Sequence, residues 1–151
     1  MVLEPGTRPP SITASNQWDE RVSPDFRTPT VLYFYPRDDT PGCTTEAQAF
    51  NDRYEEYHEA GVEVYGVSTD DVDSHCEFAE EHDLSFDLLA DPDGTIAEAF
   101  DVEIRDGNRA RRTTYVLAKG QIVGVYEGVR PEGHAGEVLR DLMEAGLVPM
   151  E

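Results

Sequence analysis

Cys43 is the residue in this sequence that is best placed to do chemistry. It follows an apolar run, residues 31–35, that predicts a buried strand, and a helical pattern begins at the cysteine itself. A cysteine at a helix start lies beside backbone N–H groups without intrahelical partners and beside the positive end of the helix dipole. Both favour the thiolate, which is the nucleophilic form. We therefore expect Cys43 to be a nucleophile and the chain to be an enzyme. The alternative is a buried structural thiol.

The chain has a second cysteine, Cys76, and the two do not form a Cys-x-x-Cys pair. Two cysteines without clustered histidines are too few for a structural zinc site. In a reducing cytosol, a catalytic thiol or a transient redox pair is more common than a permanent disulfide. The spacing also disfavours a disulfide oxidoreductase, which would use a Cys-x-x-Cys motif.

Acidic residues dominate the charge of this chain. The formal net charge is -20, from 32 acidic and 12 basic residues, and Lys119 is the single lysine. Such a charge repels nucleic acid and anionic membranes, so neither is an expected partner. The acids are spread along the chain, and the charge therefore belongs to the whole surface. It favours solubility, and we interpret it further as adaptation to high salt, which indicates a halophilic source.

The length of 151 residues predicts one domain, residues 1–151. No apolar run approaches the ~20 residues that span a bilayer. Residues 1–6 lack the basic and apolar regions of a secretory signal. These observations predict a soluble, cytoplasmic protein.

Periodicity and turn residues predict the elements that must position Cys43. A short hairpin is expected near 10–14 and 17–22, and Asp106-Gly107 marks another hairpin turn. Helices are expected at 43–60, 71–83 and 95–100, and a last one is expected to open at Pro131. The second of these helices would bury Val72, Cys76 and Ala79 on one face. Strands are expected at 31–35, 62–67, 86–89, 113–118 and 121–126.

Strands that alternate with helices, followed by a hairpin and a terminal helix, predict an α/β fold with a central mixed sheet flanked by helices. The strands at 31–35 and 62–67 should be parallel neighbours, because a helix connects them. The later hairpin should add antiparallel strands on the other side.

The strand-to-helix turn resembles the active site of peroxiredoxins, whose pattern is P-x-x-x-T-x-x-C. The pattern is present here as Pro36, Thr40 and Cys43, and the run from Thr40 to Ala47 is similar to the bacterioferritin-comigratory-protein (PrxQ) subfamily. Further matches follow in the family's order and extend the likeness over about residues 30–145: Asp73-Ser74-His75, Phe78, Asp91 to Gly94, Arg112 to Leu117, and His134. The resemblance implies a thioredoxin-like fold of the peroxiredoxin type.

The resemblance also implies roles for individual residues. Cleaving a peroxide bond needs a thiolate, donors that hold the peroxide in line, and stabilisation of the departing oxygen. Cys43 would supply the thiolate, with Thr40 and the backbone at Gly42 binding the peroxide. Pro36 would rigidify the loop and shield the sulfur. Arg112 would supply the cation.

Two points about the cation stay open from the residues alone. Strand alternation does not say which face meets Cys43, so Arg109 and Arg111 compete with Arg112, which only the motif match favours. Glu46 would orient the arginine by resemblance, whereas an ordinary first-turn acid is the alternative. His75, His134 and the tyrosines at 33, 35 and 65 are interpreted as hydrogen-bonding, capping or core residues.

One subfamily feature is missing here. Many members carry a resolving cysteine five residues after the first, and this position is Gln48. Because other members resolve from the next helix, Cys76 is our candidate, and it would condense with the Cys43 sulfenic acid. Both helix ends would have to unwind, since bridged Cα atoms approach within ~7 Å. The alternative for Cys76 is a buried apolar thiol.

The function that we expect is a thiol-dependent peroxidase that reduces hydrogen peroxide and organic hydroperoxides without metal, haem or flavin. The resemblance implies a thioredoxin-like or small-thiol reductant and a monomer. The alternatives are a one-cysteine peroxidase recycled by an external thiol, and a non-enzymatic redox sensor or holdase.

Overall fold

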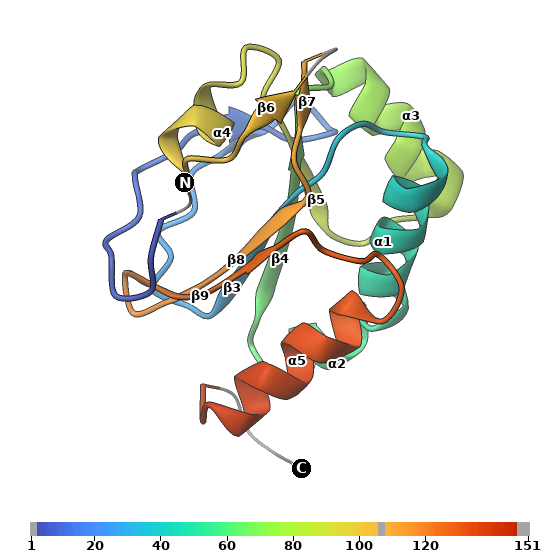
Figure 1. Cartoon of the computed structure of the whole chain (residues 1–151). Coiled ribbons are helices and arrows are strands. Elements are labelled where there is room, and N and C mark those ends of the chain that lie inside the picture. The colour runs from blue at the N-terminus through green and yellow to red at the C-terminus, as the bar shows by residue number, and fades with distance from the viewer. Residues whose placement is uncertain (1–2, 106–107, 148–151) are drawn as a thin grey trace.

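A five-stranded mixed sheet forms the centre of the protein. The computed structural model describes residues 3–105 and 108–147. Strands β3, β4 and β5 are parallel, β8 runs antiparallel to β3, and β9 runs antiparallel to β8 at the edge of the sheet (Figure 1). The predicted parallel pairing and the added hairpin are therefore confirmed. From one edge of the sheet to the other, the strands are β5 (Asp87–Ala90), β4 (Glu63–Ser68), β3 (Thr30–Phe34), β8 (Thr113–Ala118) and β9 (Gln121–Glu127).

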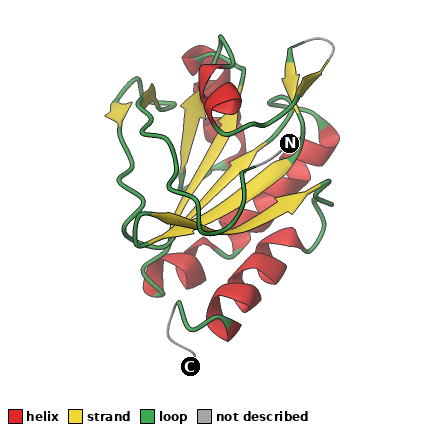
Figure 2. Ribbon diagram, turned by 60° about the vertical axis from the view of Figure 1, so that its left-hand side comes forward, coloured by secondary structure: helices red, strands yellow, loops and turns green. Residues whose placement is uncertain are grey.

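Helices cover both faces of the sheet (Figure 2). They are α1 (Pro41–Asp52), α2 (Tyr54–Glu59), α3 (Val72–His82), α4 (Thr95–Ala99) and α5 (His134–Glu144). Val31 and Tyr33 of β3 pack with the residues of α1, α3 and α5, whereas Leu32 and Phe34 pack with those of α4. A strand that is covered on both faces needs apolar side chains on both, which explains the unbroken apolar run. All five residues of β3 are buried.

Two short antiparallel pairs lie outside the central sheet. Strands β1 (Ala14–Ser15) and β2 (Arg21–Val22) form the first, which corresponds to the short hairpin predicted near the N-terminus. Strands β6 (Ile104–Arg105) and β7 (Arg109–Ala110) form the second. The predicted turn residues of that second hairpin, 106 and 107, lie outside the described residues.

The predicted helix at 43–60 is wrong at its start and in its middle. The helix begins at Pro41, because the fixed φ of proline suits the first helical position, where no N–H is needed. It stops at Arg53, whose amide donates to the carbonyl of Phe50 at 3.2 Å, and α2 begins at Tyr54. The Tyr57 hydroxyl donates to the Ala135 carbonyl at 2.5 Å, which ties α2 to α5. Gly61 ends the pair with φ 76°, as predicted.

The prediction that Pro131 opens the last helix is also wrong. Helix α5 begins at His134, and its N-cap is Gly133 with φ 78°. The helix buries Val138, Leu139 and Leu142. Pro131 lies in the loop that connects β9 to α5.

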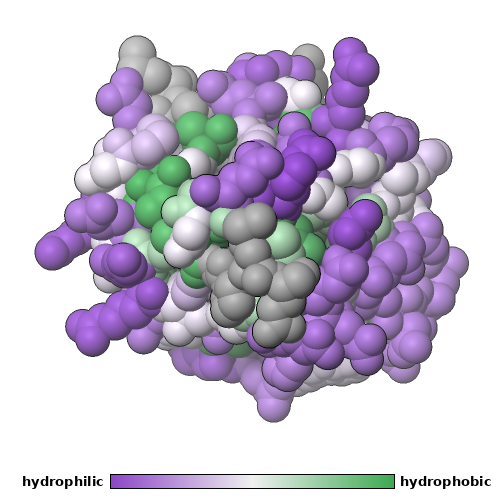
Figure 3. Space-filling view, turned by 90° about the horizontal axis from the view of Figure 1, so that it is seen from below, coloured by the Kyte–Doolittle hydropathy of each residue, from purple (hydrophilic) through white to green (hydrophobic). Residues whose placement is uncertain are grey.

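Polar side chains cover most of the face that Figure 3 shows, with a smaller apolar area near its centre. In the part of the chain that the structure describes, no helix has the length and apolar character to cross a membrane.

Candidate active site

Cys43 lies in the first turn of α1, next to the end of β3. Its side chain is 1% exposed and its thiol is free. Thr40 is the N-cap residue, and the first intrahelical bond runs from the Thr44 amide to the Thr40 carbonyl at 2.8 Å. The amides of Gly42 and Cys43 precede that bond, so they belong to the set of helix-start donors that α1 itself does not use. The local fold thus places a thiol among fixed donors.

Arg112 supplies the positive charge beside this thiol. It immediately precedes β8, and its guanidinium Nη2 donates to the Cys43 Sγ at 3.4 Å while Nη1 donates to Glu46 Oε1 at 2.7 Å. The planar fork of an arginine can hold two such acceptors at once, which a lysine cannot do in the same geometry. The side chain is 17% exposed, so a small molecule can approach it from solvent.

Glu46 is the buried partner of this arginine. Its side chain is 0% exposed, and burial raises its pKa to about 7, although the charge of Arg112 and its hydrogen bond pull the pKa down. Among the described residues, none gives a hydrogen bond to Oε2. The alternative interpretation, an ordinary first-turn acid, is wrong because that residue would face solvent.

Gly42 makes the room that Arg112 needs. A Cβ at this position would lie 3.1 Å from the Arg112 Nη2 and 3.7 Å from the Cγ of Pro131. The loop that contains Pro131 therefore borders the catalytic turn, a contact that sequence periodicity did not indicate. A larger residue at position 42 would push the guanidinium away from the sulfur.

The competing arginines lie elsewhere. Arg111 pairs with Glu127 at 3.3 Å, and Arg109 is an exposed residue of β7. In the described structure, neither gives a hydrogen bond to Cys43. Arg112 alone of the three reaches the sulfur, as the motif match predicted.

Thr40 and Pro36 flank the thiol on the loop between β3 and α1. The Thr40 hydroxyl donates to the carbonyl of Arg37 at 3.0 Å and not to the Cys43 sulfur. It is partly exposed, and so is Pro36, which follows the buried Tyr35. Their roles toward a peroxide stay predictions.

Cys76 is not on the buried face of α3, which corrects the predicted face of Val72, Cys76 and Ala79. The buried residues of this helix are His75, Phe78 and Ala79. The Cys76 thiol points outward and donates to Glu80 Oε1 at 3.2 Å. That hydrogen bond, together with slight desolvation and nearby acids, raises the pKa of Cys76. A buried apolar thiol, the alternative interpretation, is therefore excluded.

Acidic side chains line a groove between helix α3 and the loop that connects β3 to α1, which we call the catalytic loop. We call it the acidic groove, and its carboxylates are Asp38, Asp39, Asp70, Asp71, Glu77 and Glu81. Arg37 is the one basic residue that lines it. The groove runs beside the loop that carries Thr40 and leads toward the helix that carries Cys76.

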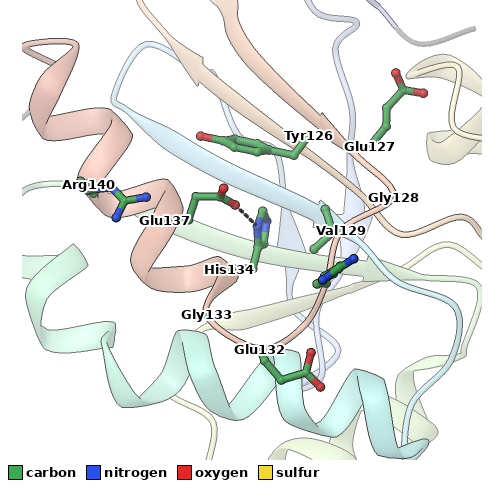
Figure 4. Close-up of a pocket in the computed structure, with 10 residues that line it drawn as sticks. Tyr126, Glu127, Gly128, Val129, Glu132, Gly133, His134, Glu137 and Arg140 are labelled. Atoms are coloured by element: carbon green, nitrogen blue, oxygen red, sulfur yellow. Dashed lines mark hydrogen bonds and ion pairs between the residues drawn. The ribbon is translucent and has the colours of Figure 1, made fainter.

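A second depression lies around His134, at the start of α5 (Figure 4). His134 Nε2 lies 2.9 Å from Thr114 Oγ1, and Nδ1 lies 3.3 Å from Glu137 Oε1. Burial lowers the pKa of this histidine. Neither Cys43 nor Arg112 lines this depression, and His134 joins α5 to β8 as a hydrogen-bonding residue, in agreement with its predicted role.

Comparison with known proteins identifies the family to which this chain belongs. Residues 5–125 match the AhpC/TSA family. The chain is 38% identical over 149 residues to the putative peroxiredoxin bcp of Coxiella burnetii, covering 92% of this chain and 98% of that protein. The chain belongs to the AhpC/TSA family and is a peroxiredoxin of the BCP/PrxQ type. Peroxiredoxins are thiol peroxidases, so a cysteine-based, peroxide-reducing role follows.

Two further comparisons define how far the likeness extends. The chloroplastic peroxiredoxin Q of Triticum aestivum is 44% identical over 140 residues, which cover 89% of this chain and 64% of the wheat protein. This peroxiredoxin thus spans just under two thirds of that relative. The bacterioferritin comigratory protein of Xanthomonas campestris, solved in a study of its alkyl peroxide reduction, aligns with TM-score 0.83 at 32% identity, over 90% of this chain and 92% of that one. Structures of the Xanthomonas peroxiredoxin Q also exist with one or another of two cysteines replaced by serine.

Proposed function

We propose that Cys43 is the nucleophile of this peroxiredoxin and that Arg112 activates it. The observation that carries the proposal is the Arg112 guanidinium, which spans the Cys43 sulfur and the buried Glu46 carboxylate. A permanent cation at 3.4 Å from a sulfur stabilises the thiolate and can also donate to a bound peroxide.

In the oxidising step, the Cys43 thiolate attacks one oxygen of ROOH. The S–O bond forms as the O–O bond breaks, Cys43 becomes a sulfenic acid, and the departing RO⁻ takes up a proton and leaves as ROH. Arg112 and the helix-start amides at Gly42 and Cys43 would stabilise the developing negative charge, as preorganised donors do. Thr40 would turn its hydroxyl from the Arg37 carbonyl to the peroxide.

In the resolving step, the Cys76 thiol attacks the sulfenic sulfur, a disulfide forms and water leaves. A thioredoxin-like or small-thiol reductant then reduces the disulfide. The outward position of Cys76 supports this role, because a thiol that is not packed in the core is free to move. The buried Cys43 must leave its place under Arg112, because bridged Cα atoms lie within ~7 Å.

The test uses Cys43→Ser and Cys76→Ser in a peroxidase assay coupled to a thiol reductant, with mass spectrometry after one equivalent of peroxide. We expect Cys43→Ser to lose turnover, and Cys76→Ser to stop at a sulfenic acid on Cys43. Full turnover in Cys43→Ser would refute the proposed nucleophile. A wild-type protein that keeps a sulfenic acid and a free Cys76 would instead be a one-cysteine peroxidase, and a single oxidation followed by stable partner binding would indicate a sensor.

We also propose that the protein is a cytoplasmic monomer adapted to concentrated salt. The support is its formal charge of -20 with a single lysine. In dilute buffer such a surface repels itself, and salt screens the repulsion. Sedimentation velocity across a range of salt concentrations tests the oligomeric state.

A further inference from the structure

A buried polar cluster ties the catalytic loop to helix α3. The Asp38 carboxylate lies in that loop and accepts hydrogen bonds from the Tyr35 hydroxyl at 2.6 Å and from the Ser74 hydroxyl at 2.8 Å. Its Oδ2 also lies 2.7 Å from His75 Nδ1. The side chains of Asp38 and His75 are 3% and 0% exposed. Among the described residues, none of this cluster gives a hydrogen bond to the Cys43 sulfur, which Arg112 contacts instead.

The partners of the two ring nitrogens of His75 indicate a hydrogen bond between its ring and Asp38. His75 Nε2 lies 3.1 Å from the carbonyl oxygen of Leu89, which only accepts, so Nε2 carries a hydrogen. The 2.7 Å contact between Nδ1 and the carboxylate then requires a second hydrogen between them. Asp38 and His75 therefore share a buried hydrogen bond. The other titratable groups that face it are Tyr35, whose hydroxyl is bonded to Asp38, and Asp70, which accepts the Asp38 amide at 2.7 Å.

The pair joins the two segments that must separate before the cysteines can meet. Asp38 lies on the loop that leads into Cys43, and His75 directly precedes Cys76 in the first turns of α3. Cys43 is buried beneath Arg112, whereas Cys76 points outward to Glu80, so a disulfide requires both segments to open. While this hydrogen bond is intact, both segments are held in the arrangement in which Cys43 is buried and Cys76 points outward.

We propose that the Asp38–His75 pair is a latch that sets the rate at which the oxidised Cys43 reaches Cys76. This inference rests on the proposed resolving role of Cys76. Breaking this buried hydrogen bond removes an interaction that only the closed arrangement makes, so the open arrangement becomes more populated. Disulfide formation then accelerates, and the sulfenic acid has less time to meet a second peroxide and become sulfinic. Asp38 and His75 are positioning residues in this account.

The experiment follows attack and resolution separately in single-turnover, chemically quenched reactions read by mass spectrometry. His75→Phe removes both ring donors at similar volume, and Asp38→Asn removes the charge with little change in shape. In both variants we expect disulfide formation to accelerate about tenfold or more, since a hydrogen bond to a charged group is lost. Sulfenic acid formation should change by less than about threefold. Glutamine can still donate a hydrogen bond to Asp38, so the rate of disulfide formation in His75→Gln should lie between the rates of these two variants and that of the wild type.

Leu142→Ala is the matched control, because Leu142 is buried in α5, a helix that supplies no residue to the Asp38–His75 pair. It destabilises the fold in general and should leave the disulfide rate unchanged. Hydrogen exchange should show faster exchange of the α3 first-turn amides in the latch variants alone. The latch is refuted if His75→Phe and Asp38→Asn slow sulfenic acid formation and leave the rate of disulfide formation unchanged. It is also refuted if Leu142→Ala accelerates disulfide formation as much as they do. If the wild type forms no Cys43–Cys76 disulfide, the proposed resolving role fails first, and the latch with it.

Discussion

The buried Glu46 predicts a measurable dependence of stability on pH. Its pKa rises from 4.5 to about 7 in the folded protein because burial disfavours the carboxylate. A carboxyl whose pKa is raised on folding stabilises the protein fully below the unfolded pKa, and this stabilisation is lost as the pH rises through the folded pKa. Between pH 5 and pH 8 the loss amounts to about 2.5 kcal/mol, at 1.36 kcal/mol per pKa unit. Because the side chain is 0% exposed, no correction for solvent screening applies.

Glu46→Gln isolates this effect, since glutamine has the same shape and does not titrate. Urea unfolding of both proteins at pH 5 and pH 8 gives a double difference, in which the pH response of all other carboxyls cancels. Between pH 5 and pH 8, we expect the free energy of unfolding of the wild type to fall by about 2.5 kcal/mol more than that of Glu46→Gln. This corresponds to about 5–10 °C in Tm. Parallel pH curves for the two proteins would refute the reasoning and would mean that Arg112 keeps Glu46 ionised throughout.

Three further predictions concern the site, the packing and the surface. Arg112→Lys should slow sulfenic acid formation by roughly 10- to 100-fold, because a lysine cannot hold sulfur and carboxylate together, and a stopped-flow rate within twofold of wild type would contradict this. Gly66→Ala should destabilise by about 1–3 kcal/mol in urea, because its Cβ would lie 2.9 Å from the Tyr33 ring. Gly124→Ala is its control, since the nearest atom there is 3.8 Å away, and an equal loss in both would exclude packing as the cause. Finally, Tm should rise from dilute to molar salt, whereas an unchanged Tm would argue against salt adaptation.

The catalytic turn could be predicted from the sequence because its signals are local. An unbroken apolar strand, the pattern of Pro36, Thr40 and Cys43, and the helical periodicity after the cysteine all lie within a short stretch of the chain. The choice of Arg112 over its neighbours was possible only through the motif, because alternation along a strand does not say what lies opposite. The structure shows what lies opposite Arg112: Gly42 leaves space there for the guanidinium.

The face of α3 could not be predicted from apolar periodicity because a polar residue occupies its centre. His75 is fully buried, and counting it as polar shifted the predicted face toward Cys76. The break at Arg53 and the position of Pro131 were also missed, since each depends on contacts with segments far along the chain. Tyr57 reaches Ala135, and Pro131 borders Gly42.

We expect the negative charge of the acidic groove to affect the oxidation of the protein and its reduction differently. Hydrogen peroxide and alkyl hydroperoxides are uncharged, so six carboxylates beside the catalytic loop do not slow their approach. A thiolate, or a reductant that presents an acidic surface, is repelled over about one Debye length, which is ~10 Å at 0.1 M salt. We therefore expect the rate of oxidation by peroxide to be insensitive to ionic strength, and the rate of reduction by an anionic thiol to rise as salt is added.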